Sequence, residues 1–65
     1  MSSKLKDLGM LIAGKDNMKE LSRRLQEFRA TSLMNDLELA QQADATQVEL
    51  TALISKLSRK ISEVL

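Results

Sequence analysis

The C-terminal third of this chain carries the feature that most constrains its fold. Apolar side chains follow one another there at spacings of four, three, four and three residues: Leu50, Ile54, Leu57, Ile61 and Val64. This rhythm keeps side chains on one stripe of a helix and is typical of the seam of a coiled coil or an antiparallel helix pair. The sequence therefore predicts a helix that presents this stripe to another helix.

The length of the chain, 65 residues, leaves room for one domain with a thin core. Folds of this size usually gain stability from disulfides, a metal ion or a partner subunit. The chain has no Cys, and it has no His for an ordinary zinc site. We therefore expect no metal and no cofactor, and we expect a partner, either a second copy of the chain or another protein.

The composition is that of a folded helical protein. Hydrophobic residues make up 43% of the chain, and it contains no Pro and two Gly. The net charge of +1 gives no argument for nucleic acid or an anionic membrane. No stretch approaches the ~20 apolar residues of a membrane span. We expect a cytoplasmic protein.

Two breaks are predicted along the chain. Helical spacing of apolar residues predicts a short helix over 4–13, which Gly14 would end. A long helix over 17–43 follows, with Asp16 or Asn17 as its cap. A second break at 43–46 precedes a last helix over 46–65, where Thr46 and Glu49 have the spacing of a capping box.

The long helix has two apolar faces. Its first half forms a stripe that would pack on the last helix, consisting of Met18, Leu21, Leu25 and Phe28. Its second half places Leu33, Met34 and Leu37 on a different face. We interpret this as a candidate face for a partner, and the alternative is that the short N-terminal helix folds back and covers it. Either the helix continues and buries two faces in turn, or it breaks near Thr31 and restarts with Ser32 as cap. We favour a continuous helix.

The predicted fold class is all-α. Short connections bring successive helices back antiparallel, so Met18–Gln42 and Gln47–Val64 would form a helical hairpin with the short helix ahead of it. Residues 1–65 would form a single helical domain. The second apolar face predicts that this hairpin completes a helical bundle by oligomerisation or by partner binding.

The sequence contains no group of residues suited to catalysis. The Ser and Thr side chains have no His to activate them, no glycine-rich phosphate loop is present, and 65 residues hardly enclose a substrate pocket. We expect no enzyme activity and no small-molecule substrate.

A basic cluster on the long helix is a candidate phosphate-binding patch, consisting of Lys19, Arg23, Arg24 and Arg29. Interleaved glutamates argue against it, because Glu20 and Arg24 have the spacing of a helical ion pair.

The function that we expect from these features is helix–helix packing, by an adaptor or chaperone-like subunit of a macromolecular assembly. The alternative is a homodimeric helical hairpin that binds RNA or DNA through the basic cluster. In its length, capped turn and amphipathic helices the chain resembles two groups of small helical-hairpin proteins. One group is the co-chaperones of type III secretion needle subunits, and the other is the dimeric regulators of plasmid RNA. No motif is shared, so no functional residues are carried over.

Overall fold

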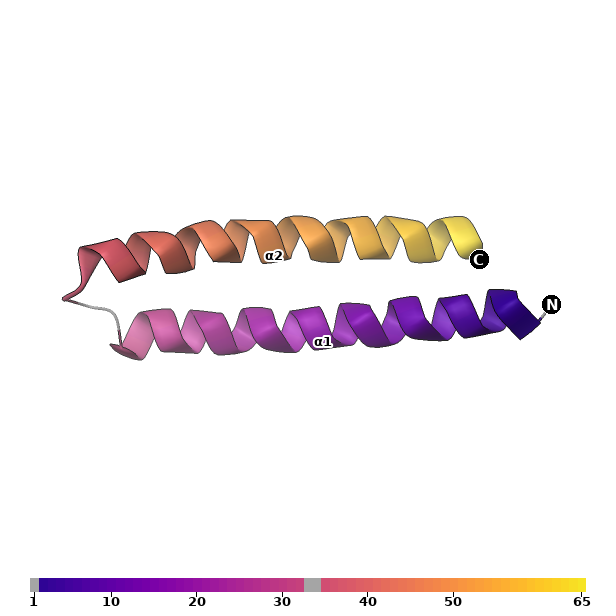
Figure 1. The fold of residues 1–65 in the computed structure, drawn as a ribbon, viewed down its shortest axis with the longest axis horizontal. Helices are drawn as coiled ribbons and strands as arrows, with labels where there is room; N and C mark the ends of the chain where they lie inside the picture. The colour runs from indigo at the N-terminus through magenta and orange to yellow at the C-terminus, as the bar shows by residue number, and fades with distance from the viewer. Residues whose placement is uncertain (1, 33–34) are drawn as a thin grey trace.

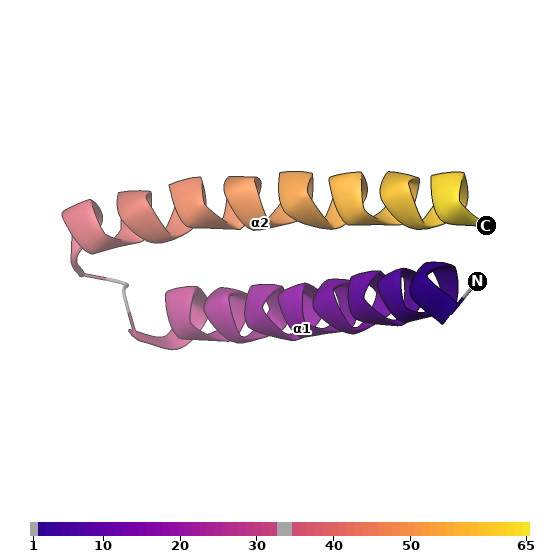
Figure 2. The same cartoon turned by 45° about the vertical axis from the view of Figure 1, so that its right-hand side comes forward.

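The chain folds into two long antiparallel helices. A computed structural model describes residues 2–32 and 35–65, with helix α1 at Ser2–Ser32 and helix α2 at Leu37–Val64. The helices lie side by side, and both ends of the chain lie at the same end of the molecule (Figures 1 and 2). The molecule is a rod of 52 × 14 × 12 Å. The predicted all-α helical hairpin is confirmed.

Helix α2 begins at a well-formed cap. Asp36 has extended backbone angles, and its carboxylate accepts a hydrogen bond of 3.0 Å from the backbone N–H of Leu39. The backbone carbonyl of Asp36 accepts a further bond of 2.9 Å from the N–H of Ala40. Glu38 lies in the first turn, where the positive end of the helix dipole favours a negative charge. Asp36 therefore fixes where the second helix starts.

The predicted break at Gly14 is wrong. The predicted short helix and the first half of the predicted long helix are parts of one helix, α1, which passes through Gly14 with a negative φ. The physical reason is the packing on both sides of the glycine. Leu8 and Leu11 continue in register into Lys15 and Met18, so an unbroken helix keeps all four beside α2. A helical glycine costs only about 1 kcal/mol, which this packing outweighs.

The predicted break at 43–46 is also wrong. Helix α2 runs through this segment, where Ala43 is one of the two buried residues. The Thr46 hydroxyl does not cap a helix but donates to the carbonyl of Gln42, one turn earlier, at 3.0 Å. Such a bond is compatible with a helix interior, because it leaves the backbone ladder intact.

The preference for a continuous helix through 31–32 is wrong as well. Helix α1 ends at Ser32, and the chain reverses before Leu37. The alternative of a break at this point was right in its position but not in its cap, since Asp36 rather than Ser32 caps the next helix. The apolar stripe moves around the predicted helix because the two halves belong to different helices.

The helices meet along a heptad seam, in which spacings of three and four residues alternate. On α2 the seam starts at Ala40 and Ala43, which are 4% and 7% exposed. It continues through half-buried positions, namely Gln47, Leu50, Ile54, Leu57, Ile61 and Val64. On α1 the half-buried seam positions are Leu8, Leu11, Lys15, Met18, Ser22, Leu25 and Arg29. Alternating spacings of this kind are the pattern of coiled-coil packing.

Contacts across the seam define the register of the two helices. Near the turn, Arg29 pairs with Asp44 at 3.1 Å, and Leu25 packs on the two buried alanines. At mid-length the Gln47 amide donates to the Ser22 hydroxyl. Near the chain ends, Leu11 and Leu57 line the same groove. Each step forward along α1 therefore matches one step back along α2.

The hairpin leaves much of its surface exposed. Its radius of gyration is 15.1 Å, whereas a compact domain of this length has about 11 Å. Its accessible surface is 5123 Å², against about 4,200 Å² for a compact monomer of the same mass. A two-helix rod has one buried seam, so the other faces of both helices remain in solvent.

The corrected helix boundaries predict the effect of removing the Asp36 side chain. Asp36→Ala should lower the free energy of unfolding by about 1 kcal/mol, because Leu39 loses its capping acceptor. Asp36→Asn should retain most of the stability. The matched control is Thr46→Ala, at the position that the sequence suggested as a cap. Thermal unfolding followed by circular dichroism measures all three, and a larger loss for Thr46→Ala than for Asp36→Ala would contradict the boundaries.

Candidate interaction face

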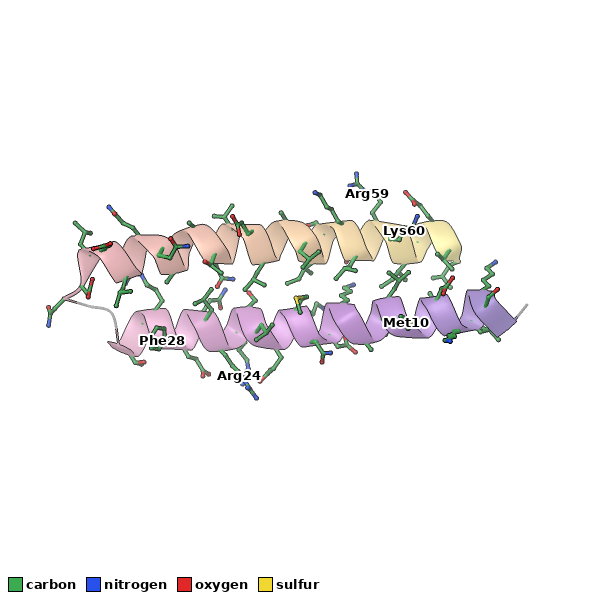
Figure 3. The ribbon with its side chains drawn as sticks, viewed as in Figure 1. Met10, Arg24, Phe28, Arg59 and Lys60 are labelled. Atoms are coloured by element: carbon green, nitrogen blue, oxygen red, sulfur yellow. The ribbon has the colours of Figure 1, made fainter. Side chains whose placement is uncertain are left out.

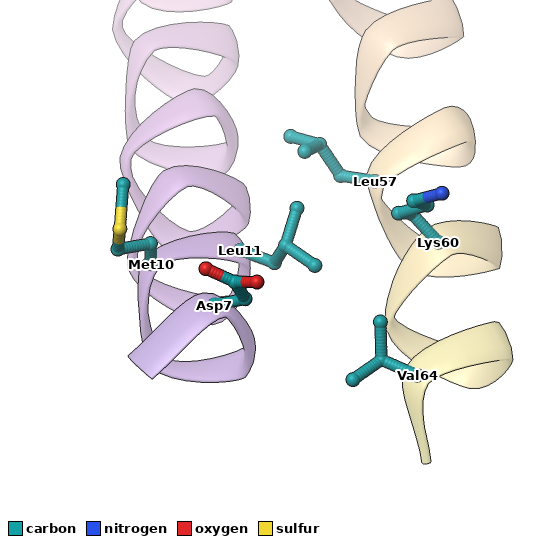
Figure 4. A pocket seen from close by; sticks show the side chains of 6 residues that line it. All are labelled: Asp7, Met10, Leu11, Leu57, Lys60 and Val64. Carbon is teal, nitrogen blue, oxygen red and sulfur yellow. The ribbon is translucent and has the colours of Figure 1, made fainter. Parts of the chain in front are cut away.

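An apolar groove lies between the helices at the end where the chain begins and ends. Its volume is about 370 Å³, and it is lined by Asp7, Met10, Leu11, Leu57, Lys60 and Val64. Leu11 points from α1 toward α2, while Leu57 and Val64 point back from α2 (Figure 4). Asp7 and Lys60 are the two charged residues among the six. The groove is therefore an apolar depression with one acid and one base in its lining.

Further apolar side chains lie along the same side of the rod. Leu21 and Phe28 follow Asp7 by four and six helical turns, and Leu53 and Leu39 precede Lys60 by two and six turns. Seven residues make two turns of such a helix, so these residues share the side of the groove. Their exposed fractions are substantial: Leu21 47%, Phe28 50%, Leu39 53% and Leu53 43%, with Met10 at 65%. We call these five residues and the groove the groove face.

The predicted packing stripe is placed only in part along the seam. The five predicted residues of α2, from Leu50 to Val64, are all half-buried seam positions. On α1, Met18 and Leu25 lie in the seam. Leu21 and Phe28 instead lie beside the seam and remain about half exposed. The sequence interpretation placed them in the seam because the predicted break at Gly14 concealed the continuous spacing of the helix.

The seam positions that the sequence interpretation missed are mostly polar. Lys15, Ser22 and Arg29 continue the spacing of Leu8 and Leu11 without being apolar. The signal that could have found them is the unbroken alternation of three and four residues through Gly14. Polar residues at seam positions weaken a hydrophobic pattern although the spacing persists.

The predicted partner face falls largely outside the described residues. Leu33 and Met34 lie in the segment that the structure does not describe. Leu37 is the first residue of α2 and is 72% exposed. Further exposed apolar side chains among the described residues lie along the groove face, and others, such as Leu5, Ile12 and Val48, lie on other sides of the rod.

The predicted basic cluster is dispersed and largely paired. Arg23 forms ion pairs with Glu20 and Glu27, both at 2.5 Å, and Arg24 pairs with Glu20 at 3.1 Å. Arg29 faces α2 in the seam and pairs with Asp44. Arg24 points away from α2 (Figure 3). Lys19 is exposed and has no ion pair within residues 2–32 and 35–65. The four cations therefore do not form one face that a phosphate backbone would follow.

The glutamate at the centre of this network is strongly perturbed. Hydrogen bonds from Arg23 and Arg24 lower the pKa of Glu20 to about 2, from an ordinary value of 4.5. The hydrogen bond to Glu20, together with the negative charges of Glu20 and Glu27, raises the pKa of Arg23 above its ordinary value. The Glu20 side chain is 44% exposed, so salt screens the interaction. The network keeps Glu20 ionised and stabilises the middle of α1.

One polar pair is enclosed within the seam. The side-chain amide of Gln47 donates to the Ser22 hydroxyl, and Gln47 Oε1 is buried without a hydrogen-bond partner among the described residues. A buried polar side chain at a seam position disfavours other registers, since a shifted partner would leave it without its bond. The pair also reduces the stability of the seam itself.

The described residues show no basis for metal chemistry. Within residues 2–32 and 35–65, no group of three or more acidic side chains is close enough to hold a metal ion. Neither helix in the described part of the chain is long and apolar enough to cross a membrane. No protein family, curated protein or solved structure matches this chain.

The lowered pKa of Glu20 predicts a dependence of stability on pH. Because its folded pKa is below its unfolded value, the stabilisation is fully present above pH 4.5 and is lost as the pH falls toward about 2. Thermal unfolding between about pH 6 and about pH 2 should therefore show a smaller loss of stability for Glu20→Gln than for the original chain.

The control for this measurement is Asp16→Asn, at an exposed aspartate with no ion pair in the described part of the chain. It should leave the acid-induced loss of stability unchanged. An identical pH profile for Glu20→Gln and the original chain would contradict the role given to Glu20.

The enclosed polar pair predicts a second, non-additive effect. Ser22→Ala alone should lower the free energy of unfolding by about 1 kcal/mol, because the Gln47 amide loses its acceptor. The double variant Ser22→Ala/Gln47→Leu should recover that loss or exceed the original stability, since no unpaired polar atom remains in the seam. Urea denaturation provides the comparison. A double variant that is less stable than Ser22→Ala would contradict this account.

Proposed function

We propose that this protein is a small, non-enzymatic interaction module that acts by packing the groove face against another helical surface. In this role it would serve as an adaptor or chaperone-like subunit of a larger assembly, with a cytoplasmic location. The observation that carries the proposal is the groove face, where five large apolar side chains are 43–65% exposed along one side. Exposed apolar surface of this extent is typical of an interaction site.

The composition of the hairpin supports the same proposal. Its buried core consists, among the described residues, of Ala40 and Ala43, with Leu25 packed against them. A seam of this kind provides little stabilisation for a free chain of 65 residues. Burial of the groove face in a complex would add the hydrophobic stabilisation that the isolated seam lacks.

The distribution of charge favours protein over nucleic acid as the partner. Arg23, Arg24 and Arg29 are already paired with carboxylates of the same chain. A phosphate backbone would have to displace those carboxylates, and the net charge of +1 gives little long-range attraction. The homodimeric nucleic-acid-binding regulator is therefore the second choice.

The two functions predict opposite responses to salt. Association through the groove face should persist from about 0.1 M to 0.5 M NaCl, because hydrophobic burial is insensitive to screening. Binding to nucleic acid should weaken steeply over the same range. Sedimentation velocity of the pure chain and fluorescence anisotropy with a labelled RNA hairpin and a labelled DNA duplex test both. Saturable, salt-sensitive binding to either nucleic acid, lost in Arg23→Gln/Arg24→Gln, would overturn the proposal.

A further inference from the structure

We propose that the groove face is a self-association surface, on which a second copy of this chain packs with its turn over the open end of the first. Two hairpins would then form a four-helix bundle with two-fold symmetry. This inference rests on the proposed function, for which it names the partner. Surface area, shape and charge along the groove face each support it.

The area of the hairpin matches what a stable dimer requires. The accessible surface exceeds that of a compact monomer of this mass by about 900 Å². A standard protein interface buries about 800 Å² per partner. Two rods stacked face to face would bury a surface of this order.

The shape of the groove face favours one orientation of the two copies. Phe28 lies six helical turns after Asp7 on α1, and Leu39 lies six turns before Lys60 on α2. The two residues therefore lie opposite each other near the turn. The groove face is thus hollow at the open end and carries large exposed side chains at the turn end. A two-fold axis that crosses α1 near Asn17 places Phe28 and Leu39 of each copy over the groove of the other.

The opposite orientation fits less well. If the open ends of both copies lay together, each groove would face the other groove, and Phe28 of each copy would lie over Leu39 of the other near the turn. Unfilled apolar grooves lose contacts that the first orientation makes. We therefore infer the arrangement in which the turn of each copy covers the open end of its partner.

The charges along the α2 edge of the face are self-complementary. Glu49 and Lys56 are exposed residues of α2, and they lie two turns apart on either side of Leu53. A two-fold axis near Leu53 brings Glu49 of one copy toward Lys56 of the other. Asn17 and Arg24 occupy the corresponding edge of α1. The face thus has an apolar centre and a polar rim, as protein interfaces usually do.

Disulfide trapping tests this arrangement directly, because the chain has no cysteine of its own. Asn17→Cys places one thiol of each copy beside the proposed axis, so mild oxidation should give a covalent dimer in high yield. The matched control is Asp16→Cys, which is also exposed but points to the outer side of α1. It should remain largely monomeric. Equal trapping of both variants, or of neither, would overturn the proposed orientation.

Sedimentation equilibrium tests the association itself. The original chain should form a dimer, and Phe28→Gln should weaken it by at least about tenfold, because Phe28 would leave the partner groove. Val48→Gln is the control, since Val48 is 70% exposed on another side of α2. Circular dichroism checks that each variant stays helical, and the trapping experiment does not depend on Phe28→Gln.

The outcomes separate this inference from the proposed function. A chain that is monomeric at every concentration, with no binding to nucleic acid, would overturn self-association and leave packing against a different protein in place. Salt-sensitive binding to RNA or DNA through the arginines would overturn the proposed function itself. An original chain and Phe28→Gln with equal dimer affinity would show that another surface mediates association, which also overturns the inference.

Discussion

The heptad seam between α1 and α2 is the constraint on which the rest of the structure depends. Each helix alternates spacings of three and four residues along its whole length, which keeps one stripe facing the other helix. Because the hairpin has just this one seam, every other face of both helices is exposed to solvent. The long shape, the groove and the exposed apolar side chains all follow from that geometry.

The seam is uneven along its length, and this unevenness creates the groove. Near the turn it consists of small or polar residues, with Leu25 packed on Ala40 and Ala43. Near the chain ends it consists of Leu11, Leu57 and other branched side chains, which do not fill the space between the helices. The larger side chains near the chain ends leave an apolar depression of about 370 Å³, whereas the depression near the turn, between Leu25 and Ala43, measures about 160 Å³. The two ends of the hairpin therefore differ in shape although the spacing of the seam is constant.

The sequence predicted the fold class because hydrophobic spacing is a strong local signal. The stripe from Leu50 to Val64 is apolar throughout, and its place in the structure follows directly from the rhythm. The boundaries failed because capping and glycine signals are weak, at about 1 kcal/mol each, and long-range packing overrides them. Gly14 and Thr46 lie inside helices since the seam continues on both sides of them.

The groove face could not be predicted for a related reason. Leu21 and Phe28 occur beside seam positions that are partly polar. When a sequence is read alone, the more hydrophobic of two neighbouring positions is assigned to the core. Only the register set by Ser22 with Gln47 and by Arg29 with Asp44 shows which side of α1 meets α2. These polar contacts select a single alignment and place the larger apolar side chains outside the seam. The same choice that makes the hairpin specific thus leaves Phe28 half exposed, where its burial requires a second molecule.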